Sequence, residues 1–243
     1  MRGWLVFLMV VLAGCAAPLP GRQAPTGEVD VLLIGEQHDA PSHAGLHRAR
    51  IAQLLTAQRL ASLALEMVEA GRSTTGLARD ASEDDVRRAL GWNESAWPWA
   101  RYGPTVMLAV RAGVPVLGAN LERGRMAGAM RDETLDATVA AAALAAQREA
   151  VREGHCGLLP ESQVAPMTRV QLARDARMAG TLAAAAVPGK VVVLIAGAGH
   201  VDPSLGVPRH LPRGLRVESL VWPPEPQERD YCAGLQRQLR APG

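Results

Sequence analysis

The sequence predicts an α/β fold: one domain with a mainly parallel central sheet and helices on both faces. Short runs of apolar residues without polar alternation recur along the chain, as expected of strands buried on both faces. Segments with helical spacing lie between these runs, and such β–α alternation is typical of α/β proteins. No internal repeat or second domain is visible, so one sheet must organise the core.

The elements follow one another at regular intervals. Four strands read Val-Asp-Val-Leu-Leu-Ile, Ala-Ser-Leu-Ala-Leu, Val-Pro-Val-Leu and Lys-Val-Val-Val-Leu-Ile, at residues 29–34, 61–65, 114–117 and 190–195, and a weaker fifth run covers 215–222. We expect helices at residues 42–59, 82–90, 104–112, 135–153 and 167–186. Because aromatic residues make up only 3% of the chain, the core must consist mainly of Leu, Val, Ala and Ile.

Composition excludes several classes of protein. The 243 residues are 48% hydrophobic and 21% charged, which is ordinary for a folded protein and unlike disordered, collagen-like or multispan membrane chains. The 26 basic and 24 acidic residues are scattered and give a net charge of +2, so no basic surface for nucleic acid is predicted. The chain also lacks a dinucleotide fingerprint, a P-loop and a Gly-x-Ser-x-Gly elbow.

Residues 1–14 have the pattern of a lipoprotein signal peptide. Arg2 is followed by an apolar stretch at residues 4–12, shorter than the roughly 20 residues that a membrane-spanning helix needs. The stretch ends in Leu-Ala-Gly before Cys15, which predicts cleavage there and lipidation of the Cys15 thiol. The alternative is an ordinary secretory signal with an incidental cysteine.

The residues after Cys15 indicate how the protein is anchored. Ala16 and Ala17 follow the cysteine, at positions where lipoproteins of the inner membrane often carry an aspartate. We therefore expect lipid anchoring to the outer membrane, facing the periplasm. Residues 15–28 contain several prolines and glycines, which predicts a flexible tether before a domain at residues 29–243. In the oxidising periplasm, Cys156 and Cys232 are expected to form a disulfide; two free buried thiols are the alternative.

Polar residues follow the predicted strands at the end where parallel α/β sheets bind ligands. Glu36 and His38 follow the first strand, Glu66 the second, Asn120 the third and His200 the fourth. Because these strands are parallel, we expect all five side chains to meet at one edge. Two carboxylates and two imidazoles there can bind a divalent metal, activate water or hold a polar ligand. Each residue alone is equally consistent with a helix cap or a loop surface.

Two Gly-x-x-His motifs, at residues 35–38 and 197–200, end the first and fourth strands. With Leu-Glu-Met at 65–67 and segments 97–104, 116–120, 154–156 and 171–178, they resemble the ChaN-type haem-binding lipoproteins over residues 29–211. That family belongs to a superfamily with the Tiki proteases, TraB proteins and erythromycin esterases. The resemblance implies an outer-membrane lipoprotein that binds haem in a dimer-associated pocket and serves haem or iron uptake. A homodimer and an outer-membrane haem receptor are the implied partners.

The resemblance also implies a tyrosine as axial ligand of the haem iron. Only Tyr102 and Tyr231 exist, and Tyr102 is preferred because Arg101 beside it is suited to a propionate. His43 and His200 are further haem-binding candidates.

Several of these residues have other interpretations. Trp97 and Trp99 near Tyr102 are suited to covering a porphyrin face, although such clusters also fill cores. His43 and His47 have helical i, i+4 spacing and face either the site or solvent.

Two other functions stay open at this point. In the first, Glu36, His38, Glu66 and His200 hold a divalent ion or activate water in a metal-dependent hydrolase, as the superfamily's proteases and esterases suggest. In the second, the protein is a periplasmic scaffold in which these residues are relics. Kinship of motifs does not by itself establish chemistry.

Overall fold

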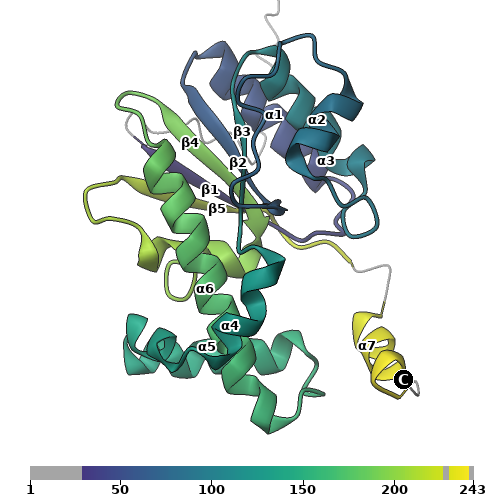
Figure 1. Cartoon of the computed structure of the whole chain (residues 1–243), viewed down its shortest axis with the longest axis vertical. Helices are drawn as coiled ribbons and strands as arrows, with labels where there is room; N and C mark the ends of the chain where they lie inside the picture. Colours follow the sequence, from purple (N-terminus) through teal and green to yellow (C-terminus); the bar gives the residue numbers. More distant parts are fainter. Residues whose placement is uncertain (1–28, 227–229, 241–243) are drawn as a thin grey trace, which may run out of the picture.

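The computed structural model describes residues 29–226 and 230–240, and its core is a five-stranded sheet with the order β3-β2-β4-β1-β5. The strands are β1 Val31–Glu36, β2 Leu60–Glu69, β3 Val116–Asn120, β4 Val191–Gly197 and β5 Val217–Val221. All neighbouring strands pair in parallel, so the predicted α/β fold is confirmed (Figure 1). The signal peptide, Cys15 and the tether lie outside the described residues.

Helices cover both faces of the sheet (Figure 1). They are α1 His43–Thr56, α2 Glu83–Leu90, α3 Trp99–Arg111, α4 Met126–Arg131, α5 Ala141–Gly154, α6 Glu161–Ala185 and α7 Tyr231–Arg240. Short 3₁₀ turns lie at Arg123–Arg125, Glu133–Thr138, Ala198–Val201 and Val207–His210. Within the part of the chain that the structure describes, no helix is both long and apolar enough to cross a membrane.

Two helices begin earlier than predicted, because a proline lies inside each. α3 begins at Trp99 rather than at Pro104, and α6 begins at Glu161 rather than near residue 167, with Pro166 inside it. A proline removes one backbone hydrogen bond, yet the preceding turns stay helical because they bury Trp99 and Val164. The predicted helix at 135–153 is interrupted: a 3₁₀ turn ends at Thr138 before α5 begins.

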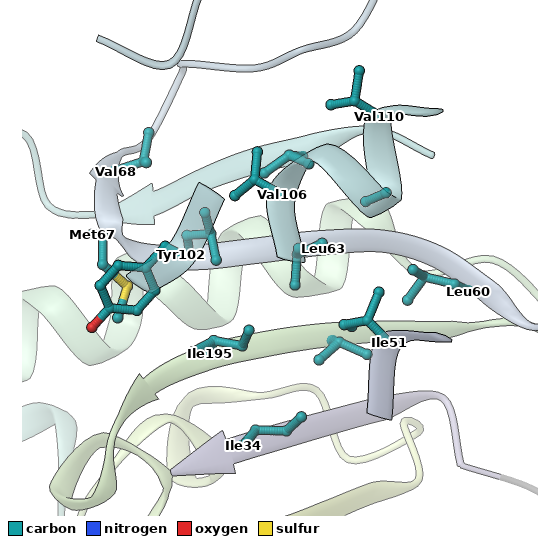
Figure 2. Packing of buried hydrophobic residues seen from close by; sticks show 14 of the residues in the cluster. Ile34, Ile51, Leu60, Leu63, Met67, Val68, Tyr102, Val106, Val110 and Ile195 are labelled. Atoms are coloured by element: carbon teal, nitrogen blue, oxygen red, sulfur yellow. The ribbon is translucent and has the colours of Figure 1, made fainter. Parts of the chain in front are cut away.

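Side chains on β1 and β4 alternate between two hydrophobic clusters. On β1, Leu32 and Ile34 pack toward α1 and α3, whereas Val31 and Leu33 pack toward α6. Figure 2 shows the first cluster and places Tyr102 at its end nearest the strand arrowheads, with the hydroxyl pointing away from the aliphatic side chains. The helices on this face therefore carry residues from the core to the carboxyl edge of the sheet.

The two cysteines of the described chain lie together. The Sγ atoms of Cys156, just after α5, and Cys232, in α7, are 2.00 Å apart, the distance of a disulfide, and their Cα atoms are 5.6 Å apart. This contact links positions 76 residues apart and attaches the C-terminal helix to the loop between α5 and α6.

Candidate functional site

The two Gly-x-x-His motifs pack against each other at the carboxyl edge. Glu36 pairs with Gly197 across β1 and β4. A Cβ atom added to Gly35 would lie 2.4 Å from Val201 Cγ2, and one added to Gly197 would lie 2.9 Å from His38 Nε2. Each glycine therefore makes room for the turn or the histidine of the other motif, which explains why both motifs begin with glycine.

Carboxylates and imidazoles alternate along this edge in a continuous line, which we call the acid–imidazole line. His200 Nδ1 donates to Asp175 Oδ1 at 2.5 Å, and His200 Nε2 lies 3.3 Å from Glu66 Oε1. Glu66 Oε2 lies 3.8 Å from His38 Nε2, and His38 Nδ1 donates to Glu36 Oε1 at 2.8 Å. The structure thus brings together Glu36, His38, Glu66 and His200, as the parallel strands predicted.

The line is charged at its buried end. Burial disfavours a protonated His200, but the charge of Glu66 and the hydrogen bond to Asp175 raise the pKa of His200 from 6.5 to about 10. Burial likewise disfavours ionised Glu66, but His200, His38 and the backbone N–H of Gly197, which donates to Oε2 at 2.7 Å, lower the pKa of this carboxyl well below its usual value. His200 is therefore an imidazolium beside the ionised Glu66 at neutral pH. Burial raises the pKa of Asp175 above its usual value, although the hydrogen bond and the charge of His200 oppose this.

His38 is the solvent-accessible member of the line. Its side chain is 38% exposed, while those of Glu36 and Asp175 are fully buried. Partial burial lowers the pKa of His38, but its hydrogen bond to Glu36 and the charge of Glu66 outweigh this and raise it above 6.5. A molecule outside the line can therefore contact His38, which in turn contacts the buried carboxylates of Glu36 and Glu66.

Glu36 also contacts two groups on the helices. The Tyr102 hydroxyl donates to Glu36 Oε1 at 2.5 Å, and burial together with the charge of Glu36 raises the pKa of Tyr102 far above its usual value. His47 Nε2 lies 3.3 Å from Glu36 Oε2; burial lowers the pKa of His47 to about 4 although Glu36 opposes this. Tyr102 and His47 are therefore both neutral.

Two predicted residues secure the backbone at this edge. His43 is buried; its Nδ1 accepts the backbone N–H of Gln37 at 3.1 Å and its Nε2 donates to the Pro223 carbonyl at 3.0 Å. With both nitrogens used, His43 presents no free atom to a ligand. The Asn120 amide donates to the Glu66 carbonyl at 2.9 Å, which ties the end of β3 to β2.

Sequence reasoning gave no role to two residues of α6. Asp175 is completely buried against His200, and the amide nitrogen of Gln171 lies 3.0 Å from His200 Nδ1. Both belong to the segment 171–178 that carried part of the family resemblance, and their i, i+4 spacing places them on one helix face. A search for acidic residues on the helix facing the second Gly-x-x-His motif would have found Asp175.

A cavity of about 430 Å³, which we call the His38 cavity, opens beside His38. Its lining residues are His38, Asp39, Ser95, Ala96, Trp97, Pro98, Arg101, Tyr102 and Tyr231. The Trp97 ring meets His38 edge-on with centroids 4.8 Å apart and Tyr102 at 6.1 Å. The Arg101 guanidinium donates to the carbonyls of Ala40 at 2.9 Å and Asp39 at 3.2 Å, which holds it at the wall.

Trp97 also lines a second cavity of about 500 Å³, which includes Glu66 and Asn120. Arg72, Arg123 and Arg174 bring three positive charges to this side. Trp97 thus borders both hollows at the carboxyl edge. Trp99, by contrast, is buried and donates its indole N–H to Glu83 at 2.7 Å, so it belongs to the core rather than to either cavity.

The chemistry of the line does not favour a metal centre. Among residues 29–226 and 230–240, no group of three or more His, Cys, Asp and Glu side chains is arranged to hold a metal ion. The imidazole nitrogens of His38 and His200 are directed at carboxylates instead. The metal-dependent hydrolase alternative therefore finds no support in the described site.

Comparisons with known proteins agree with this architecture. A solved structure described as "Cofacial heme binding to ChaN of Campylobacter jejuni" is similar in fold, with a TM-score of 0.68 and 22% sequence identity over 84% of this chain and 85% of that one. No curated protein matches the sequence. Residues 25–211, which include both Gly-x-x-His motifs, Glu66, Tyr102 and Asp175, match the family described as "Haem-binding uptake, Tiki superfamily, ChaN". The chain therefore belongs to this haem-binding uptake family.

Proposed function

We propose that this protein binds haem in the His38 cavity. The family match supports haem as the ligand, and the cavity itself carries the proposal of where it binds. Trp97, Arg101 and two tyrosines line a cavity of about 430 Å³. This volume is within the range of ligand-binding pockets. No other class of ligand is suggested by both the family and these side chains.

The lining side chains fit the chemical parts of haem. The Trp97 ring offers flat apolar surface for a porphyrin, and the buried Tyr102 ring packs against Trp97. Arg101 brings a positive charge suited to a propionate. Ferric haem supplies an iron with an open coordination position, for which a phenolate is a suitable ligand.

The two tyrosines differ in their access to such an iron. The Tyr102 side chain is 2% exposed and its hydroxyl proton is held by Glu36. Tyr231 is 48% exposed at the cavity, and its hydroxyl takes part in a hydrogen bond with Asp39. We therefore propose Tyr231 as the iron ligand and Tyr102 as part of the wall, which reverses the preference drawn from sequence.

Titration with hemin tests this proposal. The wild-type protein is expected to develop a Soret band and a tyrosinate-to-iron charge-transfer band. Tyr231→Phe is expected to lose the charge-transfer band and to bind hemin roughly tenfold more weakly, equivalent to about 1.4 kcal/mol. Tyr102→Phe is the matched control, because it removes one phenolic oxygen and keeps the ring; it is expected to retain the band. Loss of the band in Tyr102→Phe alone would assign the ligand to Tyr102 instead.

We further propose that the protein is lipid-anchored through Cys15 in the outer membrane, facing the periplasm, and takes part in haem or iron uptake. The sequence pattern before Cys15 and the family's role in uptake support this. A homodimer and an outer-membrane haem receptor are the proposed partners. Cys15→Ser is expected to move the protein from the outer-membrane fraction to the soluble periplasmic fraction. Unchanged fractionation on a sucrose gradient would contradict the anchor.

A further inference from the structure

We propose that the Cys156–Cys232 disulfide positions Tyr231 at the His38 cavity, so that haem affinity depends on this bond. The inference rests on the proposed haem function, and deepens it by naming what holds the ligand-bearing segment in place. Tyr231 and Cys232 lie beyond residue 211, where the family match ends, whereas Cys156 lies within it.

Tyr231 and Cys232 are consecutive residues with different tasks. Tyr231 lines the cavity together with His38, Trp97 and Arg101. Cys232, its neighbour, is joined to Cys156. A displacement of Cys232 must therefore move Tyr231, because a single peptide unit separates their Cα atoms.

The anchor at Cys156 is a tight turn that extends from α5. The backbone N–H of Cys156 donates to the Glu153 carbonyl at 2.8 Å, and that of Gly157 donates to the Arg152 carbonyl at 2.9 Å. Cys156 has a φ of 58° and Gly157 a φ of 66°, a left-handed pair that closes the helix end. Arg152 in turn pairs with Glu161 at the start of α6 at 2.7 Å. The loop that carries Cys156 is thus held between two helices.

The side chains of α7 that the structure describes, at residues 231–237, are at most half-buried. Ala233, Gly234 and Leu235 are half-buried and the others are exposed. Figure 1 shows α7 standing apart from the layers of the sheet and its helices. Tyr231 does bond with Asp39, but one exposed hydrogen bond is a weak restraint on a ten-residue helix. The disulfide is a covalent restraint on this helix, so it determines how often Tyr231 occupies the cavity.

The experiment compares three variants of the mature protein: Cys156→Ser, Tyr231→Phe and the double variant. Peptide mass spectrometry with and without a reductant first establishes the Cys156–Cys232 linkage in the wild type. Cys156→Ser is expected to weaken hemin binding roughly tenfold and to lose the tyrosinate charge-transfer band, as Tyr231→Phe does. The double variant is expected to bind no more weakly than either single variant, because both changes remove the same contact.

A measurement on the haem-free protein distinguishes loss of the position of Tyr231 from a general loss of folded structure. Amide hydrogen exchange in the apo protein is expected to quicken at residues 231–237 in Cys156→Ser and to stay unchanged in β1 and β4. Tyr231→Phe, which keeps the disulfide, is expected to retain slow exchange in α7.

The failure of this inference differs from failure of the proposed function. Wild-type hemin affinity in Cys156→Ser, or losses that add up in the double variant, would overturn the positioning role and leave haem binding intact. If the wild type binds no hemin, the proposed function fails, and the dependence of affinity on the disulfide fails with it. Equal exchange in α7 of the wild type and Cys156→Ser would likewise overturn the positioning role.

Discussion

Asp175→Ala is expected to lower the free energy of unfolding by about 3–5 kcal/mol, the cost of removing one partner from a buried ion pair. Asp175 is fully buried, and its Oδ1 accepts a hydrogen bond from His200 Nδ1 at 2.5 Å. Without this carboxylate, His200 keeps only Glu66 as a charged partner and its Nδ1 proton loses its acceptor. Urea denaturation followed by circular dichroism measures the loss.

Glu149→Ala is the matched control for this substitution. Glu149 pairs with Arg152 at 2.9 Å on the surface of α5, and removing an exposed pair is expected to cost less than about 1 kcal/mol. Both variants delete one helical carboxylate, so the difference between them reports burial. A cost for Asp175→Ala as small as that for Glu149→Ala would show that Asp175 and His200 do not form a stabilising buried ion pair.

Raising the pH from 6.5 to 10 is expected to destabilise the folded protein. The pKa of His200 rises from 6.5 in the unfolded chain to about 10 in the folded state. Folded molecules therefore bind more protons than unfolded ones within this window, and stability falls as pH rises. Since each pKa unit corresponds to about 1.4 kcal/mol, His200 contributes at most about 5 kcal/mol, fully present below pH 6.5 and lost above pH 10.

The unfolding free energy of the wild type and of His200→Gln, measured between pH 6 and pH 10.5, tests this dependence. The variant is expected to be less stable at pH 6.5 and to lose less stability as the pH rises. His38, whose pKa is also raised, acts in the same direction and is present in both proteins. Because the charge of His200 lowers the pKa of His38, the difference between the two curves reports His200 together with its effect on His38. Parallel curves would show that His200 does not hold a proton in the folded state.

The strands and the edge they share follow from local sequence. Val191–Gly197 is apolar throughout because β4 lies in the middle of the sheet with neighbours on both sides. Glu36, at the last position of β1, and His200, just after β4, lie at the same edge because parallel strands end there, and His38 and Glu66 connect them. β2 continues to Glu69 rather than ending at residue 65, since Met67 and Val68 are buried. Glu66 therefore lies within a strand, yet still reaches His200.

Side-chain partners were less predictable. Nothing near Tyr102 in the sequence indicates that Glu36, 66 residues away, binds its hydroxyl. His43 and His47 lie four residues apart on α1 and were expected to behave alike. His43 instead bonds to backbone groups, whereas His47 lies beside Glu36. Such differences depend on which helix face packs against the sheet.

The sequence by itself determined which polar residues follow which strands, the presence of two Gly-x-x-His motifs and the family resemblance, because periodicity and short motifs are properties of neighbouring residues. Only the tertiary structure decided that Asp175 completes the acid–imidazole line, and that Tyr231 rather than Tyr102 is open to the cavity. The physical reason is that burial and hydrogen-bond partners are set by contacts between distant segments, which determine how much water each group can reach.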